Sequence, residues 1–108
     1  MSADVLFGKS RMWSVQVAAF RDLMSRAIAC CDDAVVGDLL AYARHVDCLS
    51  VDRYKDPRIQ SEMCRCLVAA GKRWQEELGS PSGSNAGLVR SIQRLIDHAE
   101  AFNREMPA

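Results

Sequence analysis

The apolar positions of this chain recur mainly at helical spacing. Between Arg11 and Cys31, apolar residues follow one another at intervals of three and four, as on a helix with 3.6 residues per turn. They form two neighbouring rows: Trp13, Val17, Phe20, Met24, Ala27 and Cys31 in one, and Met12, Val15, Ala19, Leu23 and Cys30 in the other. A helix that is apolar over so much of its circumference needs cover on two sides, from its own chain or from another. We therefore expect part of this helix to face a partner.

The pattern predicts four amphipathic helices with recognisable start and stop signals. Their expected bounds are 10–31, 34–49, 57–78 and 86–105. Ser10 and Asp33 are suitable N-caps, and Asp56 followed by Pro57 is a strong helix start. The stretch GSPSGSNAG, residues 79–87, has the composition of a flexible linker, long enough to reach an adjacent or a diagonal helix.

Each later helix has its own apolar seam, which we expect to face the core. The seam of the second helix is Val35, Leu39, Tyr42, Val46 and Leu49, widened by Val36, Leu40 and Ala43. That of the fourth is Leu88, Ile92, Leu95, Ala99, Phe102 and Met106. Residues 2–9 are expected to form a short lead-in turn, and we find no segment with the period-two alternation of a strand. The predicted fold is therefore all-α: one domain over residues 1–108, an antiparallel up-down-up-down four-helix bundle.

Composition and charge exclude several function classes. Fourteen basic residues balance fourteen acidic ones, and no basic stripe offers a footprint for nucleic acid. The apolar stretch at the N-terminus is too short for a signal peptide or a membrane span, so we expect neither membrane insertion nor secretion. Five cysteines, an odd number, do not suggest a disulfide framework and favour a cytoplasmic protein with reduced thiols.

Few residues suggest chemistry. His45, Cys48 and Asp52 are spaced three and four apart and would share one face of the second helix and its exit. A thiol beside an imidazole and a carboxylate can act as a redox sensor or as part of a metal site, but three such groups on one helix are incomplete without another element. Inward Cys31 and Cys66 are interpreted as small hydrophobic residues. We predict no cofactor, no metal site beyond the candidates His45 and Cys48, and no enzymatic activity.

The functional hypothesis rests on the first helix and on the two tryptophans. Tryptophan is enriched at binding hot spots, and in a bundle Trp13 and Trp74 would lie at opposite ends. The expected partner-binding residues are Met12, Trp13, Val17, Phe20, Leu23, Met24 and Trp74. The predicted function is a non-enzymatic protein-interaction module, such as an immunity or antitoxin-type protein, a secretion chaperone or an adaptor, that forms a homodimer and binds a partner protein through apolar helix surface. The alternative is a thiol- or metal-responsive bundle that uses Cys48 and His45.

Overall fold

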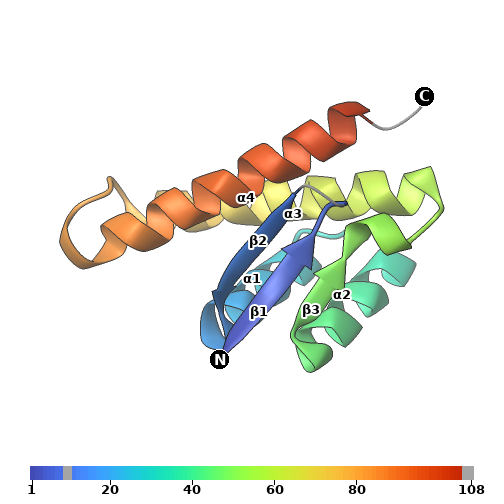
Figure 1. Ribbon diagram of the computed structural model, residues 1–108, viewed down its shortest axis with the longest axis horizontal. Coiled ribbons are helices and arrows are strands. Elements are labelled where there is room, and N and C mark those ends of the chain that lie inside the picture. Colours follow the sequence, from blue (N-terminus) through green and yellow to red (C-terminus); the bar gives the residue numbers. More distant parts are fainter. Residues whose placement is uncertain (9–10, 106–108) are drawn as a thin grey trace.

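The computed structural model describes residues 1–8 and 11–105, and its fold is α/β rather than an all-α four-helix bundle. A three-stranded mixed sheet accompanies the four α-helices (Figure 1). In chain order the elements are β1 (Ser2–Leu6), β2 (Met12–Gln16), α1 (Val17–Ala29), α2 (Ala34–Val46), β3 (Cys48–Ser50), the 3-10 turn η1 (Val51–Arg53), α3 (Pro57–Leu78), the 3-10 turn η2 (Gly83–Asn85) and α4 (Ala86–Glu105). The all-α prediction is wrong because segments assigned to a turn and to two helices form strands.

Strand β1 is the centre of the sheet. Its buried residues Ala3 and Val5, continued by Phe7, alternate with more exposed ones, which is the period-two pattern of a half-buried strand. The strand order is β2-β1-β3. Val5 lies opposite Trp13 on the antiparallel neighbour β2 and opposite Leu49 on the parallel neighbour β3. The prediction of a lead-in turn over residues 2–9 is therefore wrong, since Ser2–Leu6 is a strand.

The first helix is shorter than predicted, because the chain before Val17 is strand β2. Ser10, the expected N-cap, lies outside the described residues. Trp13 and Val15 still point inward, but from a strand. The indole N–H of Trp13 donates to the main-chain oxygen of Ser91 on α4 at 2.7 Å and to the Ser91 hydroxyl at 3.1 Å. These hydrogen bonds tie the edge strand β2 to the last helix.

The second helix ends at Val46 and not at residue 49. Asp47 adopts a left-handed conformation with φ of 59°, which aspartate tolerates better than most residues, and this turns the chain out of the helix. Its carboxylate accepts hydrogen bonds from Nε and Nη2 of Arg21 at 3.0 and 3.1 Å. Leu49 is consequently buried, as predicted, but as part of β3.

The bounds predicted for the third and fourth helices are confirmed by α3 and α4. The Asp56 side chain caps α3 by accepting a hydrogen bond from the Arg58 N–H at 3.0 Å. The two helices approach closely at Gly71, where a Cβ atom would lie only 2.9 Å from Cγ1 of Ile96. Met106, expected in the seam of the fourth helix, lies outside the described residues.

The linker between α3 and α4 is partly ordered into η2. The main-chain N–H of Ser82 donates to the Asn85 side chain at 2.8 Å, and Asn85 donates to the main-chain oxygen of Leu78 at 2.8 Å. The expectation of a wholly flexible segment is therefore corrected for residues 83–85.

The helices cover one face of the sheet. Figure 1 shows α1 behind the sheet and the long helices α3 and α4 lying side by side above it; α1 contacts β1 and β2, and α4 contacts β2. The other face of the sheet carries the more exposed strand residues, among them Met12. Among the described residues, no helix has the length and apolarity needed to cross a membrane.

Candidate functional site

The residues predicted to bind a partner lie mostly in the core. Five of the seven are buried, with exposed fractions of 5% or less: Trp13, Phe20, Leu23, Met24 and Trp74. Val17 is half-buried, and Met12, on the outer sheet face, is 58% exposed. The wide apolar circumference predicted to need a partner is covered by the sheet and by the other helices of its own chain.

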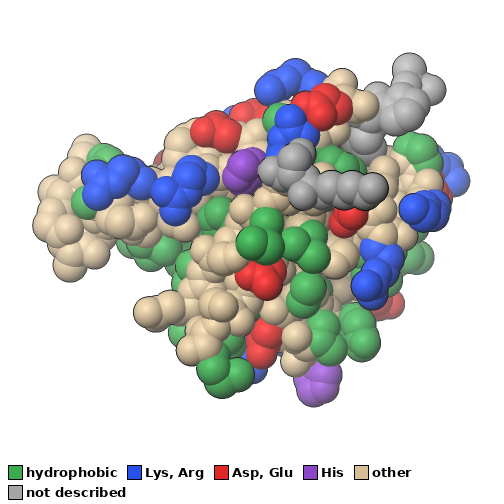
Figure 2. Space-filling model, in the orientation of Figure 1, with side chains coloured by type: hydrophobic (Ala, Val, Ile, Leu, Met, Phe, Trp, Pro, Cys, Tyr) green, Lys and Arg blue, Asp and Glu red, His purple; other side chains and the backbone are tan. Residues whose placement is uncertain are grey.

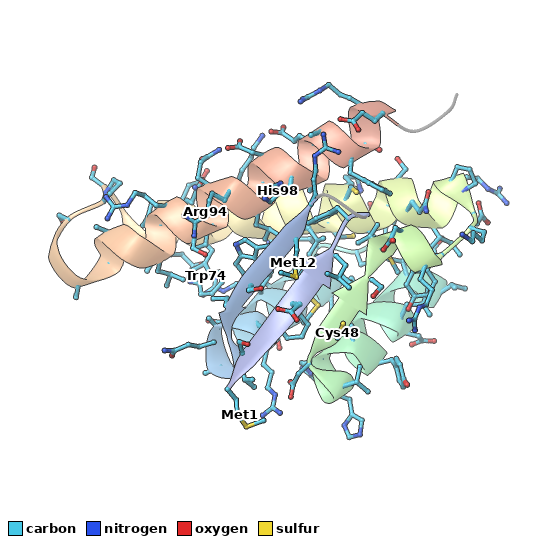
Figure 3. The ribbon with its side chains drawn as sticks, viewed as in Figure 1. Met1, Met12, Cys48, Trp74, Arg94 and His98 are labelled. Carbon is cyan, nitrogen blue, oxygen red and sulfur yellow. The ribbon has the colours of Figure 1, made fainter. Side chains whose placement is uncertain are left out.

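Trp74 on α3 is shielded by a charged side chain. The guanidinium carbon of Arg26 lies 4.9 Å from the centroid of a Trp74 ring, within the range of a cation–π contact. Arg26 is held there by Glu77 at 2.8 Å and Asp22 at 2.9 Å. The labelled Trp74 in Figure 3 lies just below α4, to the side of the sheet. It closes the core instead of projecting as a hot spot.

Helix α2 carries the apolar surface that the sequence analysis placed inside. Val35, Tyr42 and Val46 are 58%, 63% and 43% exposed, and Leu39 between them is half-buried. They lie four, three and four residues apart and therefore form one stripe along the helix. The neighbouring row, which consists of Val36, Leu40 and Ala43, is buried in the core, and Leu39 packs partly against it. We call Val35, Leu39, Tyr42 and Val46 the outer stripe.

The outer stripe continues into neighbouring surface. A hollow of about 280 Å³ lies between the starts of two helices. It is lined by Asp33 and Val35 at the start of α2 and by Asp56, Arg58 and Ile59 at the start of α3. Figure 2 shows hydrophobic side chains gathered at the lower right of the molecule, where Figure 1 places β3 and α2.

The structure does not assemble His45 and Cys48 into a site. His45 is exposed in the last turn of α2, where it lines a hollow of about 320 Å³ with Arg21, Ala41 and Arg44. Cys48 lies on β3 beyond the left-handed Asp47, and its sulfur is 3.9 Å from the Ser50 hydroxyl. Figure 3 shows Cys48 on the sheet, as Met12 is. The shared helix face that suggested a site ends before Cys48.

A different group of potential ligands comes together between the α1–α2 connection and α3. Within the described ranges 1–8 and 11–105, the ligand atoms of Cys31, Glu62 and Cys66 all lie within 4.8 Å of one another. The thiols of Cys31 and Cys66 both point at Oε2 of Glu62, at 3.8 and 3.7 Å. We call these three residues the thiol–carboxylate cluster. Cys66 is fully buried, and the other two members are half-buried.

Arg65 orients the carboxylate of the cluster. Its Nε donates to Oε1 of Glu62 at 2.7 Å and its Nη2 to Oε2 at 2.7 Å, while the Asp32 main-chain N–H donates to Oε2 at 3.2 Å. The hydrogen bonds from Arg65 are the main reason that the pKa of Glu62 falls from its usual 4.5 to about 2. Burial raises the pKa of the Cys66 thiol. The cluster therefore holds an ionised carboxylate beside two thiols.

Sequence reasoning missed this cluster because its members are far apart in the chain. Glu62 and Cys66 are four residues apart on α3, so their shared face was readable from spacing. Cys31 belongs to the break between α1 and α2, and nothing in the sequence indicated that this break lies beside the middle of α3. From the sequence, Cys31 and Cys66 are interpreted only as small hydrophobic residues.

Comparison of the chain with protein-family models, with curated proteins and with solved structures finds no match.

Proposed function

We propose that this protein is a non-enzymatic protein-interaction module that acts through the outer stripe of α2, and that the stripe binds a second copy of the same chain. The observation that carries the proposal is the row Val35, Leu39, Tyr42 and Val46 on a regular helix, in which Val35, Tyr42 and Val46 are exposed and Leu39 is half-buried between them. An amphipathic helix face left uncovered by its own chain is a recurrent docking surface.

The spacing of the stripe favours self-association. Intervals of four, three and four read the same in both directions, so a two-fold axis between Leu39 and Tyr42 brings each side chain opposite another member of the stripe. Val35 then lies opposite Val46 of the second copy, and Leu39 opposite Tyr42 of the second copy. The paired helices run antiparallel, with knobs-into-holes contacts as in a coiled coil.

Polar groups beside the stripe are complementary in the same arrangement. Asp38 and His45 border the stripe on one side of α2, and both are exposed. The antiparallel register brings Asp38 of one copy near His45 of the second copy, where an imidazole N–H can donate to a carboxylate.

The dimer is expected to be weak. Helix α2 has 13 residues and is about 20 Å long, so a pair of such helices buries less than the roughly 1,600 Å² of a standard stable interface. Association should therefore depend on concentration. We place the protein in the cytoplasm, because all five of its cysteines are free thiols and reducing compartments preserve thiols.

Sedimentation velocity over a concentration series from micromolar to millimolar tests the proposal. The wild-type chain should shift from monomer to dimer within this range, and Tyr42→Lys should raise the dissociation constant at least about tenfold by placing a charge in the interface. Met12→Lys is the matched control, because Met12 is similarly exposed (58% against 63%) but lies on the outer sheet face. A wild-type chain that stays monomeric, or equal weakening by both variants, would overturn the proposal.

A further inference from the structure

We infer that the thiol–carboxylate cluster is a binding site for a thiophilic divalent cation, with Zn²⁺ as the natural choice. Cys31, Glu62 and Cys66 supply two sulfur ligands and one oxygen ligand. Two thiolates with a carboxylate and an open fourth position form a donor set that suits zinc. This inference does not depend on the outer stripe of α2. The cluster is formed by Cys31, in the α1–α2 connection, and by Glu62 and Cys66 of α3, and it contains no residue of the stripe.

The spacing of the ligand atoms matches the metal. Zinc–sulfur bonds of about 2.3 Å and zinc–oxygen bonds of about 2.0–2.2 Å in a tetrahedron place sulfur and oxygen roughly 3.6 Å apart. In the structure, Oε2 of Glu62 is 3.8 Å from the sulfur of Cys31 and 3.7 Å from the sulfur of Cys66. Two of the edges of a tetrahedral site are therefore already near their required length.

The surroundings of the cluster hold its ligands in place. Metal-binding carboxylates are themselves hydrogen-bonded, and Glu62 is fixed by Arg65 and by the Asp32 N–H. Arg65 also donates to the main-chain oxygen of Cys30 at 2.9 Å, which fixes the residue before Cys31. One side chain thus positions the ligands from both segments.

The charges balance when zinc binds. Both thiols lose a proton on coordination, so two thiolates and one carboxylate contribute −3 against the +2 of the ion. The guanidinium of Arg65, already bonded to Glu62, compensates the remaining −1. Two protons leave for each ion bound, so zinc affinity should increase with pH.

Solvent reaches Cys31, one member of the cluster, from the side of α2. A hollow of about 480 Å³ is lined by Cys31 with Ile28, Asp32, Asp33, Ala34, Gly37, Asp38 and Ala41. Its acidic side chains would attract a cation, and water can occupy the fourth position from this side. A site with three protein ligands and one exchangeable position is open, unlike a closed structural zinc site.

Reduced, chelator-treated protein should be titrated with Zn²⁺ alone and with Co²⁺ as a spectroscopic probe. We expect one ion per chain, and for Co²⁺ both a sulfur-to-metal charge-transfer band and intense d–d bands of a tetrahedral ion. Cys31→Ser and Glu62→Gln each remove a ligand. They should weaken Zn²⁺ binding by more than the roughly 10–100-fold that outer-shell partners contribute.

Cys30→Ser is the matched control, since Cys30 precedes Cys31 and is also half-buried, while its sulfur accepts from Nη1 of Arg73 at 4.0 Å and is not a member of the cluster. This variant should bind zinc like the wild type. Circular dichroism confirms that each variant is folded. The inference is overturned if the folded, reduced protein takes up no zinc, or if Cys30→Ser weakens binding as much as Cys31→Ser. It is equally overturned if Cys31 and Cys66 oxidise to a disulfide and the reduced form still binds no metal.

Discussion

Helices α1 and α2 are consecutive in the chain and each 13 residues long, yet their apolar surfaces are used in opposite ways. The apolar residues of α1 that were expected to remain open, among them Phe20, Leu23 and Met24, are buried. In α2 most of the seam expected to be buried is the outer stripe, and the fully buried residues belong to the adjacent row, with Leu39 packed partly against the core.

The difference follows from what each helix has beside it. α1 packs against α2, α3 and the strands β1 and β2, so its wide apolar circumference is covered on more than one side. α2 packs mainly on α1 and touches β3 and α3 only at its margins, which is enough to bury one of its two apolar rows. The wide apolar surface of α1 does need cover on more than one side, and its own chain provides that cover.

The largest expected difference between the two helices is in the free energy of unfolding after alanine substitution of one aromatic residue in each. Phe20→Ala in α1 removes a fully buried ring and should lower the free energy of unfolding by about 3–5 kcal/mol. Tyr42→Ala in α2 removes a 63% exposed ring and should change it by less than about 0.5 kcal/mol. Denaturant unfolding at micromolar concentration, where little dimer forms, measures both values.

Similar costs for the two substitutions would show that the helices do not differ as described. In particular, a large loss for Tyr42→Ala in the monomer would mean that the outer stripe is covered by its own chain.

Local signals predicted α3 and α4 well. Asp56 and Pro57 fixed the start of α3, Gly79 ended it, and a clean seam defined α4, so these helices needed no knowledge of distant segments. The sheet was harder to predict, because Trp13 and Val17 fit a helical row even though the first lies in a strand. β3 has only three residues, too few for a readable alternation.

The site was less predictable than the fold. On α2 the rows Val35–Val46 and Val36–Ala43 are both apolar and about 100° apart, and periodicity cannot say which of them meets the core. Which of the two rows is buried depends on the position of β3, which follows the left-handed Asp47 and pairs with β1. The thiol–carboxylate cluster depends in the same way on tertiary contacts between the α1–α2 connection and α3.

The connection that orients α2 relative to α1 should be sensitive to acid. Glu62 accepts from the Asp32 N–H and from Arg65, and its pKa in the folded protein is about 2 against a usual 4.5. A lowered pKa stabilises the fold above pH 4.5, and this contribution is lost as the pH falls from about 4.5 through about 2. Because Arg65 is partly open to water, we expect a loss of order 1 kcal/mol.

Denaturant unfolding of the metal-free protein at about pH 5 and about pH 2.5 measures this effect. Glu62→Gln cannot ionise, so the stability of this variant should fall by about 1 kcal/mol less than that of the wild type over the same interval. Parallel losses in the two proteins would show that the Glu62 interactions contribute no acid sensitivity.

The most direct test of the central claim, that α2 presents a self-complementary stripe, is cross-linking of Val35→Cys with Val46→Cys. The antiparallel register puts residue 35 of one copy opposite residue 46 of the other. Under mild oxidation an equal mixture of the two variants should form a 35–46 disulfide, identified by mass spectrometry, well above the cross-linking of either variant alone or of the wild type. Cross-linking of each variant to itself as efficiently as in the mixture, or none above the wild type, would contradict the account.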